Sequence, residues 1–365
     1  MKEIIKLLRI VGIFTVTLSC SANNSFQNED SEIIDLIIKT EDVKIGGTLT
    51  IPTNFNTSSL VVMSSGSGPQ DRDETLEGFK IFKVIAEHLA SKGIASFRYD
   101  DRGVGTSTGD FVNSTIEDHS NDLESILDYF KTSKDHLFKS FILFGHSQGG
   151  ILAAKVAVGK ESVKKVVLMG APAVPLVEVV TYQVRQEYSH SNISQSLIEA
   201  DVSAHNNLMR AIEDNKNIND AYSLFRETTE SIFVETLSAD EVADTVKLKR
   251  KAIAKADEFK IIYALPSLTS FLYYDPSRDY ERIEVPVLGL FGGLDFQVPI
   301  HQNKDRMENA LLKSGTDYHF ITFDKANHFF QKAITGSRDE YATLEKKFVN
   351  NFLNEISTWI HDTNL

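Results

Sequence analysis

The hydrophobic pattern predicts strands and helices that alternate over most of the chain. Segments 32–40 and 43–52 alternate or run apolar, which predicts two antiparallel edge strands. Short apolar runs typical of buried strands follow at Leu60–Met63, Ile94–Tyr99, Ser140–Phe144, Val163–Met169, Val285–Phe291 and His319–Phe323. Apolar residues at helical spacing predict helices at Phe79–Ser91, Ile116–Tyr129, Ile151–Val158, Lys304–Lys313 and, as a long closing helix, Tyr341–Ile360. Continuous apolar strands that alternate with helices indicate a mostly parallel sheet with helices on both faces.

One segment in the second half of the chain departs from this alternation. No glycine occurs from 171 to 288 and no proline from 176 to 265. Because glycine and proline are the residues that interrupt helices, their joint absence favours helical structure. The longest stretches of helix-forming residues here are Leu197–Ile212 and Ala239–Phe259. We therefore predict one α/β body over 32–365 with a helical insertion over about 174–274.

Composition and charge narrow the class of protein. The chain has 365 residues, of which 42% are apolar and 24% charged, as in globular proteins. The 51 acidic and 38 basic residues give a net charge of -13, so we expect no nucleic-acid partner. The sequence contains no spacing typical of metal ligands and no phosphate-binding glycine loop. We therefore expect no cofactor and no metal.

The first twenty residues resemble a secretory signal. Three basic residues within 1–9 precede an apolar run over 10–18, which is too short to cross a hydrocarbon layer about 30 Å thick. Residues 18–20, Leu-Ser-Cys, resemble a bacterial lipoprotein processing site in which Cys20 becomes the lipidated first residue. We predict a signal peptide over 1–20, a polar tether over 21–31 and an exported body in the periplasm or cell envelope. Membrane contact is expected only through the lipid on Cys20, and plain secretion with cleavage nearby is the alternative.

Residues 145–149, Gly-His-Ser-Gln-Gly, follow an apolar strand and begin a predicted helix. A serine in such a sharp strand-to-helix turn needs glycines around it, because side chains there would clash. The turn would lift the Ser147 hydroxyl above the sheet and direct the first amides of the helix at the same space. Ser147 is therefore the candidate nucleophile.

A serine hydroxyl requires a base, and the base requires an acid that orients it. On this kind of sheet the partners follow in the order serine, acid, histidine, each just after a strand. Asp295 follows the strand that ends at Phe291, and His328 follows the strand that ends at Phe323. We predict that Asp295 orients His328, with Asp324 as the rival acid.

The loop after the strand Leu60–Met63 is the expected source of a second oxyanion donor. Residues 65–68 read Ser-Gly-Ser-Gly, which is flexible enough to turn a backbone amide toward the nucleophile. We predict the backbone amides of Ser67 and Gln148 as the oxyanion hole. The charged residues of 70–74 and 100–102 are interpreted as a buried network that fixes this loop, with a place lining the pocket mouth as the alternative, and neither group is a catalytic candidate.

These motifs together are recognisable as those of a known family. The matching segments are 65–74, 98–105, 145–150, 293–299 and 327–331. They resemble α/β-hydrolase-fold serine hydrolases, and within them the EstD-like bacterial carboxylesterases grouped with the serine aminopeptidase-type (S33-like) hydrolases. The resemblance covers most of 43–360, and the helical insertion is least similar. It implies an α/β-hydrolase fold, a Ser147–His328–Asp295 triad, a cap built from the insertion, and hydrolysis of short-chain, small-molecule esters. Gln148 stands where relatives often have glutamate.

Two other functions remain open from the sequence, and no pattern predicts an oligomeric state. The same triad would serve an aminopeptidase or a thioesterase. A peptidase must bind a free amine, and the insertion offers candidate carboxylates at Glu178, Glu187, Glu199 and Asp201. A non-catalytic binding lipoprotein on a hydrolase scaffold is the third possibility, because a fold does not fix function.

Overall fold

The computed structural model describes residues 31–55, 59–188 and 191–362. The described chain divides into two compact units, one over Pro175–Tyr274 and the other formed by the residues before and after it. The predicted signal peptide lies outside the described residues, as does the predicted tether except for Ser31, which begins the first strand. No helix in the described part of the chain is sufficiently long and apolar to cross a membrane.

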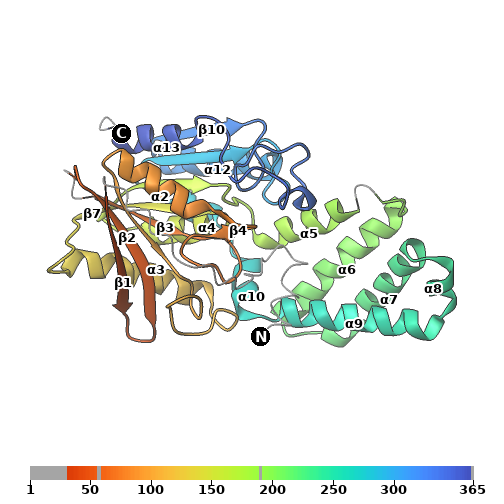
Figure 1. Cartoon of the computed structure of the whole chain (residues 1–365). Coiled ribbons are helices and arrows are strands. Elements are labelled where there is room, and N and C mark those ends of the chain that lie inside the picture. The colour runs from red at the N-terminus through yellow and green to blue at the C-terminus, as the bar shows by residue number, and fades with distance from the viewer. Residues whose placement is uncertain (1–30, 56–58, 189–190, 363–365) are drawn as a thin grey trace. The chain divides into compact units, whose positions relative to one another are not determined.

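The larger unit is built on one sheet, in which eight strands are described (Figure 1). Their order across the sheet is β1 (Ser31–Lys39), β2 (Lys44–Pro52), β6 (Ala95–Tyr99), β3 (Ser59–Ser64), β7 (Ser140–His146), β8 (Val163–Met169), β9 (Val287–Gly292) and β10 (Tyr318–Phe323). β2 is antiparallel to both β1 and β6, and the pairs from β6 to β10 are parallel. The predicted edge pair and the mostly parallel sheet are therefore confirmed.

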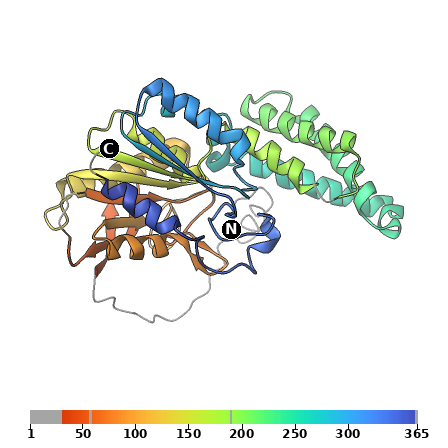
Figure 2. The same cartoon turned by 90° about the horizontal axis from the view of Figure 1, so that it is seen from above.

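Helices cover both faces of this sheet, as predicted. Alternate strand residues such as Val61, Met63, Ile142 and Phe144 form a continuous apolar core with α2 (Ile81–Ser91) and α13 (Phe352–His361). α3 (Ile116–Thr132), α4 (Gln148–Ala157) and α12 (Ile300–Ser314) pack elsewhere on the sheet, and Figure 2 shows α12 and α13 on opposite sides of it. Parallel strands place their carboxyl ends at one edge, so the loops after β3, β7, β8, β9 and β10 meet there.

The smaller unit is wholly helical in its described residues, and Figure 1 shows most of it in green. It comprises α5 (Leu176–Glu187), α6 (Gln195–Glu213), α7 (Ile218–Thr236), α8 (Ala239–Ala243), α9 (Thr245–Tyr263) and α10 (Pro266–Leu272). α6 packs on α7 and α7 on α9, and a small apolar cluster around Ile193, Ile198, Val202 and Ile232 lies within the unit. These helices occupy the segment for which the absence of glycine and proline predicts helical structure.

Two helix predictions are wrong in part. The closing helix predicted over Tyr341–Ile360 exists only from Phe352, because Phe348 pairs with Gln331 in an isolated bridge and Asn351 adopts a left-handed backbone with φ 66°. The apolar residues before it are buried as irregular chain against the core rather than on a helix face. The helix predicted over Phe79–Ser91 begins at Ile81, because Phe79 and Lys80 form β5, which pairs with β4 (Thr75–Leu76) in a small hairpin. The remaining short helices are α11 (Ser277–Tyr280) and the 3-10 turn η1 (Arg338–Glu340).

Candidate functional site

Ser147 occupies the sharp turn between β7 and α4. Its backbone has φ 52° and ψ -121°, a positive-φ conformation that is rare for a residue with a side chain and costs about 1–3 kcal/mol. A Cβ atom at Gly145 would overlap the backbone of Gly149, and one at Gly149 would overlap the backbone of Ser64. The Ser147 amide donates to the carbonyl of Met169 at the end of β8, at 2.9 Å. The glycines thus hold the serine between the carboxyl ends of β3 and β8.

His328 and Asp295 lie together in loops after the last two strands. His328 Nδ1 lies 2.8 Å from Asp295 Oδ2, and both residues are buried. The other carboxylate oxygen, Oδ1, accepts from the amides of Gln297 and Val298, each at 2.8 Å. Burial lowers the pKa of His328 despite the opposing effect of Asp295. The structure thus pairs His328 with Asp295 and not with the exposed rival Asp324.

Gly170 shows how close the serine turn comes to this pair. It directly follows Met169, the residue that Ser147 contacts. A Cβ at Gly170 would lie 3.4 Å from Asp295 Oδ2 and 3.4 Å from His328 Nδ1. The three predicted residues therefore converge at one edge of the sheet. Among the described residues no hydrogen bond joins Ser147 to His328, so the structure contains one of the two expected links.

The loop after β3 approaches the serine from another side. A Cβ at Gly66 would lie 3.2 Å from Ser147 Cβ and 3.0 Å from Glu74 Oε1, so a side chain at this point would force its neighbours to move by a few tenths of an ångström. Gln148 is the first residue of α4, and its amide has no partner among the described residues, as expected at a helix N-terminus. The same holds for the amide of Ser67, whose carbonyl accepts from Gln70 Nε2 at 3.1 Å. Both predicted oxyanion donors thus belong to segments next to Ser147, and neither amide is bonded to another described residue.

The residues interpreted as a loop-fixing network form one. Asp100 accepts two hydrogen bonds from the Arg72 guanidinium, at 3.0 and 2.6 Å, and one from the Arg72 amide at 2.9 Å. Asp101 accepts from the amide of Gln70 at 2.8 Å, and burial raises the pKa of this carboxyl well above its ordinary value. Arg102 pairs with Asp122 on α3 at 2.6 and 2.9 Å. These bonds fix the loop beside Ser147.

Sequence reasoning places Glu74 in the loop-fixing network but does not predict its partner, the buried His146. His146 Nδ1 lies 2.7 Å from Glu74 Oε1, and its Nε2 lies 3.1 Å from the backbone carbonyl of His328. Burial opposes a charge on His146, but the Glu74 carboxylate outweighs it and raises the pKa of His146. The signal available in the sequence was the position of His146, directly before Ser147 at the end of a buried strand.

The helical unit contains a separate cavity of about 200 Å³. Its walls are largely aromatic and aliphatic, and its polar groups include Asp201, His205, Glu187 and Lys255. Asp201 Oδ2 accepts from the Tyr188 hydroxyl at 2.7 Å and lies 3.5 Å from His205 Nε2. Two of the four carboxylates proposed from the sequence as amine ligands, Glu187 and Asp201, therefore line this cavity. Glu199 is exposed and pairs with Arg185.

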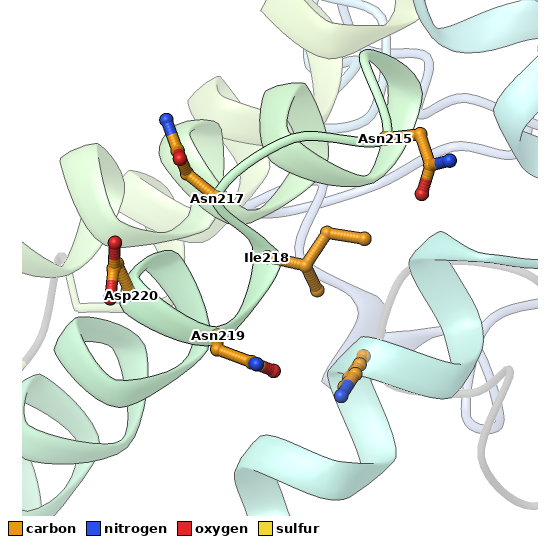
Figure 3. A pocket seen from close by; sticks show the side chains of 6 residues that line it. Asn215, Asn217, Ile218, Asn219 and Asp220 are labelled. Atoms are coloured by element: carbon orange, nitrogen blue, oxygen red, sulfur yellow. The ribbon is translucent and has the colours of Figure 1, made fainter.

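A second hollow in the helical unit carries no comparable chemistry. It lies at the turn between α6 and α7 and is open to solvent (Figure 3). Its lining residues are Asn215, Asn217, Ile218, Asn219, Asp220 and Lys260. No nucleophile faces a base among them. In the described chain no group of three or more histidine, cysteine or acidic residues is arranged to hold a metal ion.

Family models match the chain in two consecutive stretches. The model of the serine aminopeptidase S33 family matches residues 76–268, and that of the dienelactone hydrolase family matches residues 271–357. Among individual proteins, the chain is similar to esterase EstD of Thermotoga maritima, at 28% identity over 316 residues. The aligned part is 86% of this chain and 65% of that esterase, so the chain spans less than two thirds of its relative.

Solved structures show the same fold at low sequence identity. An esterase of Pyrococcus furiosus is 14% identical with a TM-score of 0.53, over 84% of this chain and 87% of that one. A proline iminopeptidase of Mycobacterium smegmatis is 12% identical with a TM-score of 0.51, over 90% and 98% of the two chains. These similarities and the sheet order confirm the predicted α/β-hydrolase fold.

Proposed function

This chain belongs to the serine aminopeptidase S33 family, and on that premise we propose that it is a serine hydrolase that cleaves carboxylic esters. The observation that carries the proposal is the convergence of Ser147 with the buried His328–Asp295 pair, whose atoms lie 2.8 Å apart. The similarity to a protein described as an esterase supports an ester as the substrate.

The proposed reaction uses each residue for one task. Ser147 attacks the ester carbonyl while His328 accepts its proton, and Asp295 holds the imidazole in the required orientation. The amides of Ser67 and Gln148 stabilise the tetrahedral oxyanion, and the loss of one such donor typically costs about 10²–10³-fold in rate. His328 returns the proton to the leaving alcohol, and water then hydrolyses the acyl-enzyme by the same steps.

Labelling with a fluorophosphonate probe tests the proposal. We expect the wild type to react and to hydrolyse p-nitrophenyl acetate or butyrate. Ser147→Ala should not be labelled, and its kcat should fall by at least about 10⁴-fold. Ser91→Ala, at the exposed end of α2, is the matched control and should behave as the wild type. A wild type that resists the probe would contradict the proposal and favour a binding lipoprotein on this scaffold.

An amine-bearing substrate, and hence aminopeptidase activity, is the second candidate. The observation in its favour is that Asp201, only 2% exposed, lines the cavity of the helical unit together with Glu187 and aromatic side chains. A buried carboxylate beside aromatic rings is suited to an ammonium group. If this function holds, aminoacyl p-nitroanilides will be better substrates than p-nitrophenyl esters, and Asp201→Asn will raise KM for the former alone. Thioesterase activity, the other alternative, requires preference for acyl thioesters over both.

We further propose that the protein is exported and carries a lipid on Cys20. The support is the basic, apolar and Leu-Ser-Cys pattern of residues 1–20. Expression with radiolabelled palmitate should label the wild type in the membrane fraction and leave Cys20→Ser unlabelled. A wild type that is cleaved and secreted without label would contradict lipidation and support plain secretion.

A further inference from the structure

The buried pair of Glu74 and His146 lies directly behind the candidate nucleophile. His146 is the last residue of β7 and precedes Ser147 in the chain. The exposed fractions of Glu74 and His146 are 2% and 1%, and their side chains meet at 2.7 Å. Surface ion pairs contribute little to stability because water screens them. A pair buried this deeply is not screened.

The partners of His146 determine its protonation. Nε2 faces the carbonyl oxygen of His328 at 3.1 Å, and a carbonyl can only accept, so Nε2 carries a hydrogen. Nδ1 faces the Glu74 carboxylate at 2.7 Å, which requires a second proton between them. The same oxygen, Glu74 Oε1, also accepts from the amide of Gly66 at 2.7 Å. The shared proton makes the pair either an imidazolium beside a carboxylate or a neutral imidazole beside a carboxylic acid, and the raised pKa of His146 favours the imidazolium.

This pair connects three separate parts of the site. Through Glu74 it holds Gly66, the neighbour of the predicted oxyanion donor Ser67. Through Nε2 of His146 it holds the backbone of His328. Because His146 directly precedes Ser147 in the chain, the pair is also linked to the nucleophile. A rearrangement of the pair would therefore displace the oxyanion loop and the base relative to the nucleophile.

The pair also places a positive charge beside the base. The rings of His146 and His328 have centroids 4.7 Å apart. The charged groups that face His146 are Glu74, Asp295 and, when protonated, His328. At so short a separation the imidazolium disfavours protonation of His328 and keeps it available as a base. Burial and this repulsion act in the same direction on His328.

A role in packing alone does not explain Glu74. Its second oxygen, Oε2, is buried and has no hydrogen-bond partner among the described residues. A buried carboxylate oxygen without a partner destabilises the folded state, and an apolar residue of similar volume would avoid that cost. Groups that are retained at such a cost are common at functional sites.

We propose that Glu74 and His146 are positioning residues of the hydrolytic site, which hold Gly66 and the His328 backbone in place and direct a positive charge at the His328 ring. This inference rests on the proposed function, since it assigns to the pair a task in that reaction. Neither residue touches the ester. Their effect should therefore appear in kcat and in the pH profile and not in KM.

Kinetics of Glu74→Gln and His146→Gln test the proposal. Both should lower kcat per fluorophosphonate-labelled site by about 10²-fold, the cost expected of a misplaced reacting group, with little change in KM. The acidic limb of kcat/KM should move to higher pH, by about one unit in His146→Gln, which removes the cation and keeps the Glu74 anion. The shift should be smaller in Glu74→Gln. His119→Gln, a buried histidine on α3, is the control and should leave the limb in place.

The outcomes separate the two proposals. If the wild type neither reacts with the probe nor cleaves esters, the proposed function fails. If the wild type does so and both variants retain its kcat per labelled site and its acidic limb, the positioning role is overturned. Should the variants fail to fold, histidine-selective 15N NMR of the wild type gives an independent test. We expect one buried histidine that keeps both ring nitrogens protonated at a pH above the ordinary histidine pKa of about 6.5, and its absence would overturn the proposal.

Discussion

Asp295 divides its two carboxylate oxygens between His328 and the backbone of its own loop. Oδ2 lies 2.8 Å from His328 Nδ1, while Oδ1 accepts from the amides of Gln297 and Val298 at 2.8 Å each. The backbone bonds fix the carboxylate, and the carboxylate in turn fixes one tautomer and one orientation of the imidazole. The base is thus oriented by contacts that persist without a substrate.

Asp295→Asn should therefore lose most activity while keeping the fold. An amide at this place favours the wrong tautomer of His328, and we expect kcat to fall by about 10³–10⁴-fold. Ester hydrolysis and the rate of fluorophosphonate labelling are the measurements. Asp324→Asn removes the exposed rival acid and should leave both rates at the wild-type values. Equal losses in the two variants would show that Asp295 is not the orienting acid.

In the wild type, kcat/KM should begin to fall on the acidic side only at a pH below the ordinary pKa of histidine. His328 must be neutral to accept the proton of Ser147, and burial lowers its pKa in the folded protein. A lowered pKa extends the neutral form to more acidic conditions, so kcat/KM should remain on its plateau until the pH falls below about 6.5. A profile of kcat/KM from pH 4 to 9 measures this. A limb above that value would contradict the assignment of His328 as the base.

Gly149→Ala should disrupt the turn that presents Ser147. The new Cβ would overlap the backbone carbonyls of Ser64 and Ser65, and backbone atoms cannot move aside as a side chain can. We expect a loss of about 3 kcal/mol in the free energy of unfolding, at the upper end of overpacking costs, together with loss of activity. Urea denaturation and ester hydrolysis measure the two effects.

Gly159→Ala is the matched control for the turn. Gly159 has a left-handed backbone with φ 73°, but a Cβ there would meet nothing within 4 Å. Its substitution should cost only the backbone strain of about 1 kcal/mol and leave kcat unchanged. If the two alanine variants were equally stable, the close approach at Gly149 would not be a constraint.

Arg72→Ala should destabilise the fold through Asp100. Arg72 binds that carboxylate in a bidentate arrangement, and Asp100 is only 3% exposed. Removal of one partner leaves a buried charge without its counterion, which costs about 3 kcal/mol. Lys160→Ala breaks the more exposed Lys160–Glu124 pair and should change stability by less than about 1 kcal/mol. Similar losses of stability in the two variants would show that the burial of Asp100 does not make its ion pair with Arg72 more important to the fold.

The Arg72–Asp100 pair predicts how wild-type stability depends on pH. Burial alone would raise the pKa of Asp100, but Arg72 and the Thr106 amide outweigh it and hold the pKa below its ordinary value of 3.8. A carboxylate with a lowered folded pKa contributes stability above its unfolded pKa and loses it as the pH falls through the folded value. The stability difference between wild type and Arg72→Ala, measured by urea denaturation, should therefore narrow below about pH 4.

The linear order of the chain was sufficient to predict much of this site. Glycines around Ser147 mark a tight turn after an apolar strand, and Asp295 and His328 each follow a further strand. Parallel strands bring such loops to a common edge, so strand order alone predicts that the three residues converge. The helical insertion was predictable for a similar reason, since the absence of glycine and proline is a local property.

The first half of the closing helix was predicted wrongly, because periodicity does not distinguish a helix face from irregular chain buried on the core. Phe348 and Phe352 pack against each other at 4.5 Å between ring centroids, yet only Phe352 is helical. The bridge from Phe348 to Gln331 decides this difference, and it joins segments whose pairing leaves no local trace in the sequence.

The sequence by itself determined the class of sheet, the place of the helical unit and the identity of the candidate nucleophile, base and acid, because each depends on neighbours within one strand and its following loop. Only the tertiary structure decided that Glu74 meets His146 and that this pair reaches both Gly66 and His328. Glu74 lies in the loop after β3 and His146 at the end of β7, and a contact between them arises from the packing of the whole sheet. Such contacts, with the charges they stabilise, are set by three-dimensional proximity, which a pattern along the chain does not contain.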